Sequence, residues 1–276
     1  MGGAAREARV ALRAAARYCR SVCHPPAVEP LHVATLNIRN SADRWSERLA
    51  LLLADMAALQ PDLMGLQECV YPMHQDRVIA AAGDGHYSIV RGWAGRPEYG
   101  NSLLVRRPLA PRNVERLDLG HNREAHRAVV ALPDGATVLF AVAHLHHVPA
   151  DEDVRVGQAT ALVDWLAAAP ETDARIVVGD FNAEPVEPAY ARLIEGGYAS
   201  AHQVANGREP DVTWPSGLKA PMIDDDGDPG CLDYIWLSGA ARVESCRLVF
   251  DRPHPDDATL YPSDHFGLSA RLLVGA

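Results

Sequence analysis

Residues 176–185 read IVVGDFNAEP, an apolar run that ends abruptly in polar residues just before a proline. An apolar run bounded by Gly and Pro is typical of a buried strand covered on both faces. Asp180 and Asn182 follow at the end of that strand. Alone, such a pair is typical of a turn, because Asp and Asn bond their own backbone and tolerate unusual dihedrals. The rest of the chain decides between a turn and a site.

Similar apolar runs recur along the sequence. They predict strands at 31–38, 63–68, 101–106, 128–132, 137–145, 231–237, 242–250 and 266–274. Amphipathic patterns predict helices over 45–59, 154–168 and 187–195, whereas 196–230, rich in Gly, Pro and Asp, is expected to be loop. Strands outnumber helices, which predicts an α/β (α+β) fold: a four-layer sandwich of two mixed β-sheets packed face to face with helices on the outside.

Composition places the chain among globular proteins. Its 276 residues carry a net charge of −10 and include five cysteines, too few and too scattered for a disulfide framework. No apolar run is long enough to span a bilayer and no secretory signal is evident, so we expect a cytoplasmic protein. We read 31–276 as one catalytic domain, preceded by a basic, helical arm at 1–30 with five arginines and two glutamates. The arm could contact nucleic acid or an acidic membrane surface, but a solvated helix face or a simple extension is the preferred interpretation.

Polar residues stand at the ends of the predicted strands. They are Asn37, Glu68, His144, Asp180, Asn182, Asp233, Asp264 and His265. If the fold gathers these strand ends at one rim, the four carboxylates would repel and desolvate one another unless a cation compensates them. Oxygen-rich ligands of this kind suit Mg²⁺, with Mn²⁺ as a substitute. The implied reaction is metal-assisted hydrolysis of a phosphoester.

A series of short motifs supports this interpretation. In order they are TLN (35–37), QE (67–68), YGNSLLVR (99–106), AHL (143–145), GDFN (179–182), TW (213–214), LDYIW (232–236) and SDH (263–265). The series resembles that of the endonuclease/exonuclease/phosphatase superfamily, whose members include pancreatic-type deoxyribonucleases, deadenylases and inositol polyphosphate phosphatases. The likeness runs from about residue 31 to the C-terminus. Each motif alone is weak, but eight in the right order are strong.

The resemblance implies a role for each matching residue. Asp180 and Asn182 would orient the attacking water and the phosphate. His144 would donate to a phosphoryl oxygen, and Asp233 would hold His265 in one tautomer as a base or as a polarising group. Glu68 would be the principal metal ligand, and the remaining assignments are Asn37 and Asp264 near the metal and Asn101, Arg127 and Thr213 in contact with the substrate or with the site residues.

The substrate stays open at this stage. Ala143 stands where many family members have Thr, and the tyrosine-bearing segment of apurinic endonucleases is not recognisable between Pro111 and Arg127. The run 219–230, KAPMIDDDGDPG, would place carboxylates at the edge of the site, where they would repel a long phosphate backbone or hold a second cation. A solvated acidic turn is the simpler interpretation. The alternatives are thus a nuclease, for which nucleic acid is the partner, and a phosphatase acting on a small molecule or lipid headgroup.

Three other classes fit less well. The dipeptide GD also occurs in calcineurin-like phosphoesterases, but no DxH motif appears on the first predicted strand. His144, His146 and His147 resemble the start of the zinc β-lactamase motif, but Val148 and Pro149 stand where an Asp-His pair is needed. A non-catalytic binding module would leave gaps in the set of site residues, and the set is complete. The sequence gives no indication of oligomeric state.

Overall fold

The computed structural model describes residues 29–91, 98–221, 223 and 227–275. The arm predicted at 1–30 falls almost entirely outside the described residues, so its helical conformation and the domain boundary stay predictions. Asp224, Asp225 and Asp226 of the acidic run also lie outside them.

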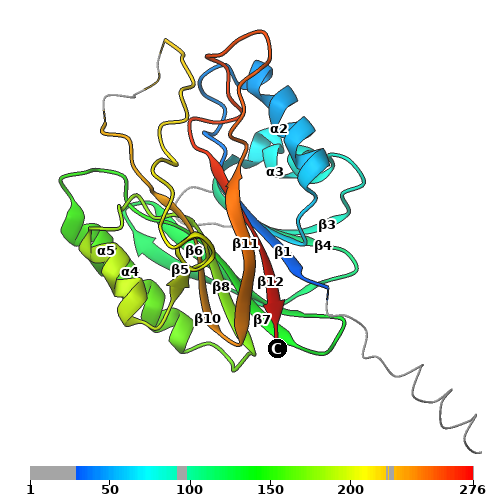
Figure 1. The fold of residues 1–276 in the computed structure, drawn as a ribbon, viewed down its shortest axis with the longest axis vertical. Coiled ribbons are helices and arrows are strands. Elements are labelled where there is room, and N and C mark those ends of the chain that lie inside the picture. Colours follow the sequence, from blue (N-terminus) through cyan, green and yellow to red (C-terminus); the bar gives the residue numbers. More distant parts are fainter. Residues whose placement is uncertain (1–28, 92–97, 222, 224–226, 276) are drawn as a thin grey trace, which may run out of the picture.

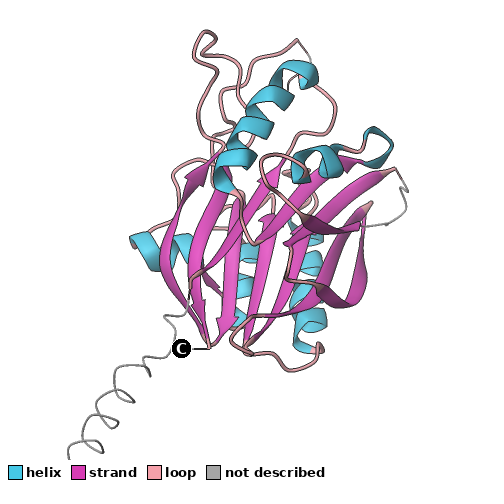
Figure 2. Ribbon diagram, turned by 90° about the vertical axis from the view of Figure 1, so that its right-hand side faces the viewer, coloured by secondary structure: helices cyan, strands magenta, loops and turns pink. Residues whose placement is uncertain are grey.

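The described strands form two six-stranded sheets, as the sequence predicts (Figure 2). The first sheet has the order β11 (Ala241–Val249), β12 (Gly267–Val274), β1 (Leu31–Asn37), β2 (Leu63–Val70), β4 (Tyr99–Arg106), β3 (Tyr87–Arg91). The second has the order β5 (Pro111–Gly120), β6 (Arg123–Ala131), β7 (Thr137–His144), β8 (Ala174–Asp180), β10 (Asp233–Gly239), β9 (Ala199–Ser200). Both sheets are mixed, because β1 runs parallel to β2 and β7 parallel to β8 while the other pairs are antiparallel.

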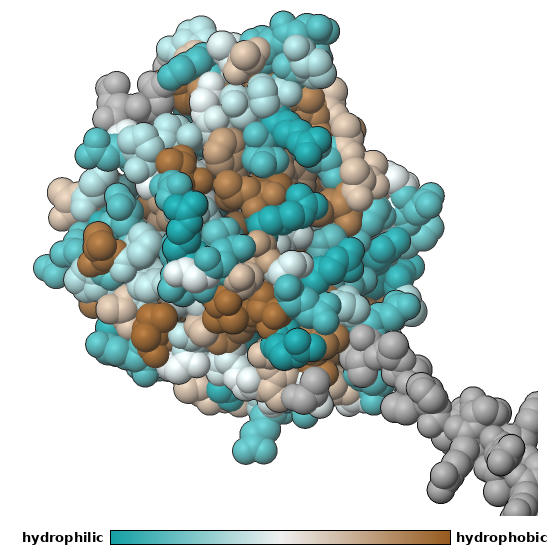
Figure 3. Space-filling model, viewed as in Figure 1, coloured by the Kyte–Doolittle hydropathy of each residue, from teal (hydrophilic) through white to brown (hydrophobic). Residues whose placement is uncertain are grey.

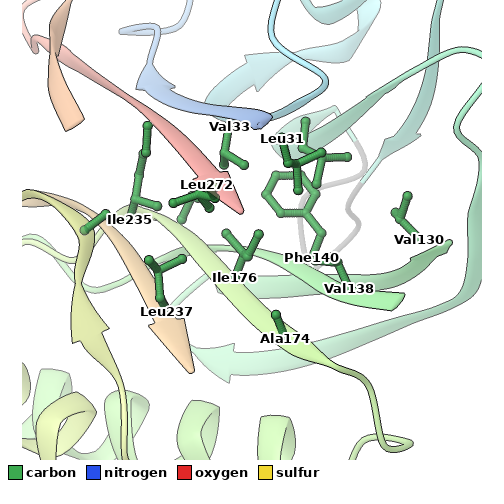
Figure 4. Packing of buried hydrophobic residues seen from close by; sticks show 14 of the residues in the cluster. Leu31, Val33, Val130, Val138, Phe140, Ala174, Ile176, Ile235, Leu237 and Leu272 are labelled. Atoms are coloured by element: carbon green, nitrogen blue, oxygen red, sulfur yellow. The ribbon is translucent and has the colours of Figure 1, made fainter. Parts of the chain in front are cut away.

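The two sheets pack face to face around an apolar core. Phe140 and Ile176 from one sheet meet Leu31, Val33 and Leu272 from the other (Figure 4). Each large side chain removed from water in this way contributes about 1.5–3 kcal/mol to the hydrophobic stabilisation of the fold.

Helices cover the outer faces (Figure 1). The first sheet is covered by α2 (Trp45–Leu59) and α3 (Gln75–Ala80), with the short 3-10 turn η1 (Tyr71–Met73) beside them, and the second by α4 (Glu152–Ala167) and α5 (Pro188–Glu195). The result is the predicted four-layer sandwich.

The element boundaries differ from the sequence-based expectation in a few places. The expected loop 196–230 contains β9 and α6 (Ala201–Asn206), whose ends carry the cap signals Ser200 and Gly207. The capping oxygen of Ser200 accepts from Gln203 N, and Gly207 adopts φ 76°. Gly and Pro around this segment obscure those signals. The strands β3 and β5 and helix α3 were not predicted, since β5 is an exposed strand with mostly polar side chains and no alternating pattern.

The register of the strands brings their polar ends to one edge. His144 at the end of β7 pairs with Asp180 at the end of the parallel strand β8. Asp233, which begins β10, pairs with Asp180 from the other side because β10 is antiparallel to β8. In the first sheet, β1 pairs antiparallel with β12, so residues before β12 lie near Asn37 at the end of β1. This arrangement follows from the direction of the strands alone.

The surface offers no extended apolar face in the view of Figure 3, where hydrophilic side chains separate groups of hydrophobic ones. Among the helices of the described residues, none is long and apolar enough to cross a membrane.

The end of strand β8 requires a glycine. Gly179 adopts φ 147°, and a Cβ at this position would overlap the carbonyl oxygen of Ala143 on the neighbouring strand. The backbones of β7 and β8 approach closely beside His144 and Asp180. This approach, and with it the position of the two site residues, requires a residue without a Cβ at position 179.

We therefore expect Gly179→Ala to lower the free energy of unfolding by about 3 kcal/mol or more, measured by urea denaturation. The matched control is Gly157→Ala, at an exposed position of α4 where a Cβ meets nothing within 4 Å. That substitution should raise stability by about 0.5–1 kcal/mol, since Ala favours helix more than Gly does. Equal stability of the two variants would contradict the structural role of Gly179.

Candidate active site

The strand ends meet at a cavity of about 1360 Å³. Seven of the eight strand-end residues line it: Asn37, Glu68, His144, Asp180, Asn182, Asp264 and His265. The eighth, Asp233, is fully buried behind His265. The structure thus brings together residues that are as far apart in the sequence as Asn37 and His265.

Asp180 lies at the centre of this set. Its Oδ2 accepts a hydrogen bond from Asn37 Nδ2 at 3.0 Å and lies 3.4 Å from His144 Nε2 and 3.8 Å from His265 Nε2. The other carboxylate oxygen, Oδ1, accepts from the backbone N–H of Asn182 at 2.9 Å. This local bond stabilises the left-handed conformation of Asn182 (φ 48°), so the side-chain amide of Asn182 turns back and donates to Leu145 O at 3.1 Å. The polar end of β8 is therefore both a local Asp–Asn turn and part of the cavity.

Asp233 and His265 form a buried pair. His265 Nδ1 lies 2.9 Å from Asp233 Oδ2. Thr213 positions this aspartate, because its Oγ1 accepts hydrogen bonds from the backbone N–H of Leu232 at 2.9 Å and from that of Asp233 at 3.1 Å. The pairing directs Nε2 of His265 toward the cavity and toward Asp180.

Glu68 is held in an unusual backbone conformation. It lies within an irregular stretch of the β2–β4 pairing, between Leu66 and Cys69, and adopts φ 64°. Such a bulge turns a side chain away from its regular direction in the sheet, and bulges and strained backbone conformations are over-represented at functional sites. The carboxylate of Glu68 accepts from Asn37 Nδ2 at 3.3 Å and from Asn40 Nδ2 at 2.8 Å.

Burial shifts the pKa values of these groups in different directions. Burial raises the pKa of Asp180 to about 7, with the charge of His265 opposing this shift and that of Asp233 adding to it. Burial alone would make His265 less basic, but Asp233, Asp180 and Asp264 together raise its pKa to about 10. Burial, followed by the nearby charge of Arg123, lowers the pKa of His144 well below its ordinary value. At neutral pH the site therefore combines a protonated His265 with a neutral His144.

The donor set on the open side of the cavity fits a hard divalent cation. Glu68, Asn37 and Asp264 offer oxygen atoms at this side of the cavity. Burial raises the pKa of Asp264, with the charges of His265 and Arg39 opposing this shift and that of Glu68 adding to it, and Arg39 Nη1 lies 3.5 Å from Asp264 Oδ2. Ligand atoms of Asp180, Asp233 and His265 also lie within 4.8 Å of one another. In that trio, however, Nδ1 of His265 is already engaged by Asp233. Glu68, Asn37 and Asp264 are thus the better fit to Mg²⁺, which prefers oxygen ligands.

Three predicted contact residues do not line the cavity. Thr213 is fully buried and acts on the backbone at Asp233, as described above. Asn101 joins β4 to β6, since its Nδ2 donates to Glu124 O at 3.0 Å. Arg127 lies on the helix-covered face of β6, where it stacks over the Trp165 ring at 4.1 Å and pairs with Glu115. The expectation that Arg127 reaches substrate is corrected by this position, because alternate residues of a strand face opposite sides of the sheet.

Several cavity residues were not predicted from the sequence. They are Arg39, Asn40, Tyr99, His121, Arg123, His147 and Trp214. Tyr99 and Trp214 belong to motifs noted in the sequence, YGNSLLVR and TW, so those motifs were a usable signal. Arg123 follows a two-residue turn at His121 and Asn122, both with positive φ, and no pattern in the sequence indicates that this hairpin reaches the cavity.

Comparison with known proteins agrees with this geometry. The model of the Endonuclease/Exonuclease/phosphatase family matches residues 34–265. The chain belongs to this family. Nocturnin of Xenopus laevis is 24% identical over 259 residues, covering 82% of this chain and 64% of that protein. The chain therefore spans somewhat under two thirds of the length of this curated relative.

Solved structures share the fold of this family member. The human Nocturnin catalytic domain with bound sulfate anion superposes with a TM-score of 0.70 at 24% identity, covering 89% of this chain and 94% of that one. Truncated Caenorhabditis elegans TDP2 gives 0.70 at 18% identity, covering 88% and 97%. A mannosyl-6-phosphatase of Bacteroides thetaiotaomicron gives 0.71 at 19% identity, covering 88% and 99%. At these identities the likeness concerns the fold.

The Asp233–His265 pair makes a measurable prediction. In Asp233→Asn, removal of the negative charge weakens proton binding to the imidazole, so the pKa of His265 should fall from about 10 toward the ordinary 6.5. An NMR titration of the imidazole signals of the metal-free protein measures this change. The matched control is Asp151→Asn, which removes the carboxylate 2.8 Å from His146 Nε2 and should leave the His265 titration unchanged. A His265 pKa that stays near 10 in Asp233→Asn would show that the pair is not the main source of the shift.

Proposed function

We propose that this family member hydrolyses phosphoester bonds in a Mg²⁺-dependent reaction, with Mn²⁺ as a substitute, by in-line attack of a water molecule. The observation that carries the proposal is the position of Asp180, whose carboxylate lies within 3.8 Å of Asn37, His144 and His265 in the cavity. A carboxylate whose pKa is about 7 suits the removal of a proton from water at neutral pH.

The neighbouring residues have complementary roles in this proposal. Asp180 and Asn182 orient the attacking water and the phosphate. His144, neutral at pH 7, donates a hydrogen bond to a phosphoryl oxygen, and protonated His265, held by Asp233, stabilises the negative charge that develops there. When bound by Glu68, Asn37 and Asp264, Mg²⁺ would polarise a phosphoryl oxygen and stabilise the leaving group.

The rim of the cavity favours a compact substrate. Glu152, Glu184 and Asp228 line the cavity in addition to the central carboxylates and to Glu187, which pairs with Arg155. Negative charge at the rim opposes a long phosphate backbone, because polyanion binding depends on neutralisation of phosphates by Lys and Arg. We therefore place a small-molecule or headgroup phosphoester ahead of nucleic acid as the substrate class. The structural relatives include a mannosyl-6-phosphatase as well as Nocturnin and TDP2.

The test is release of phosphate or mononucleotide from a panel of single-stranded DNA, RNA, a nucleotide, an inositol phosphate and bis-p-nitrophenyl phosphate, with Mg²⁺, with Mn²⁺ and with EDTA. Turnover should require the metal and should be found for the small esters. Glu68→Ala and His265→Ala should each lower kcat by about 100-fold or more, because the first removes the principal metal ligand and the second removes the cation that stabilises the developing charge on the phosphate.

The matched control is Glu171→Gln, an exposed carboxylate remote from the cavity, which should keep the activity of the unaltered protein. Circular dichroism confirms that each variant is folded. Near-normal turnover in folded Glu68→Ala or His265→Ala would overturn the assignment of the site. Rapid cleavage of the polymers would instead identify a nuclease.

A further inference from the structure

One wall of the cavity is basic and has no role in the proposed reaction. It is formed by the β5–β6 hairpin, which carries His121 and Arg123, and by the segment after β7, which carries His146 and His147. The ring centroids of His121 and His146 lie 4.9 Å apart, and those of His146 and His147 lie 5.4 Å apart. We call these four residues the basic wall.

Arg123 connects the basic wall to the catalytic residues. Its Nη1 lies 2.9 Å from His144 Nδ1 and 2.8 Å from His144 Nε2, and its Nη2 lies 3.0 Å from His147 Nδ1. The guanidinium of Arg123 thus connects His144, which we place at the scissile phosphate, with His147 at the rim of the cavity. The planar fork of Arg suits the oxygens of a phosphate group.

Among the described residues, Arg123 forms no ion pair. Within the described ranges, no carboxylate lies within 4.0 Å of its guanidinium nitrogens. Arg155, on the same side of the cavity, differs in this respect because it pairs with Glu187 at 2.9 Å. A half-buried cation whose hydrogen bonds within the described part of the chain go to imidazoles is costly unless an anion joins it.

The surrounding groups leave hydrogen-bond donors available for that anion. One carboxylate beside the wall, Asp151, is engaged by His146 Nε2 at 2.8 Å. The buried Nδ1 of the same histidine has no hydrogen-bond partner in the part of the chain that the structure describes. His121 and His147 are exposed at the cavity rim, where their ring nitrogens can donate to a ligand.

We infer that the basic wall is a second anion subsite, in which Arg123, His147 and His121 bind a phosphate group next to the scissile one. The substrate then carries two adjacent phosphates or a phosphate beside a comparable anion, and the carboxylates of the rim exclude a longer chain of them. This inference rests on the proposed function, since it places the scissile phosphate at His144.

The experiment compares binding of methylenediphosphonate, which has two linked anionic groups and resists hydrolysis, with binding of methylphosphonate, which has one. Both are titrated by calorimetry into the 276-residue chain with Mg²⁺ in excess over the ligand. The unaltered protein should bind the diphosphonate about tenfold more tightly or better, since a second charge-assisted contact is added. In Arg123→Gln and His147→Gln this preference should fall to about twofold or less, and Arg123→Lys, which keeps the charge but not the fork, should lie between.

The controls are Arg112→Gln on exposed β5 and His86→Gln, both remote from the cavity, which should keep the full preference. Equal affinity of the two ligands for the unaltered protein would overturn the inference. So would an equal loss of affinity for both ligands in Arg123→Gln, because Arg123 would then contact the scissile phosphate instead. The readout is a ratio of binding constants, so a failure of the proposed hydrolysis would appear separately, as absence of turnover in the substrate panel.

Discussion

A buried carboxylate at the end of a central strand imposes the main constraint on this molecule. Asp180 is almost fully buried, and burial of a carboxylate is unfavourable unless donors and opposite charges surround it. Those partners come from β1, β7 and the segment before β12, which provide Asn37, His144 and His265. The polar edge of the sandwich is arranged around this one group.

The strand directions make that arrangement possible. Parallel pairing of β7 with β8 and antiparallel pairing of β8 with β10 put His144 and Asp233 in register with Asp180 on either side. The close approach of β7 and β8 depends on Gly179. A shift of one residue in either pairing would turn one of these side chains to the opposite face of the sheet. The apolar core between the sheets fixes the register and therefore fixes the site as well.

The cavity has walls of opposite character. Oxygen ligands around Glu68 and Asp264 make one side acidic, and Arg123 with three imidazoles makes another basic. In the proposed reaction, the metal and the attacked phosphate lie at the acidic wall. In the proposed second anion subsite, a further anionic group lies at the basic wall. Arg123 lies where the two walls meet and contacts His144 and His147.

The sequence predicted the family, because the ordered motifs are local signals. Apolar periodicity, which is also local, predicted the sandwich of two sheets and most elements, such as the helix Trp45–Leu59. The strand-end polar residues were local signals too, and the structure brings them to one cavity. Tertiary structure alone decided which side of a sheet each residue faces: it directs Arg127 toward Trp165 and directs Arg123 into the cavity. It also decided the bulge at Glu68 and the pKa values of Asp180 and His265, because burial and the charges of distant segments set them. Chemistry that depends on neighbours in space cannot be read from neighbours in sequence.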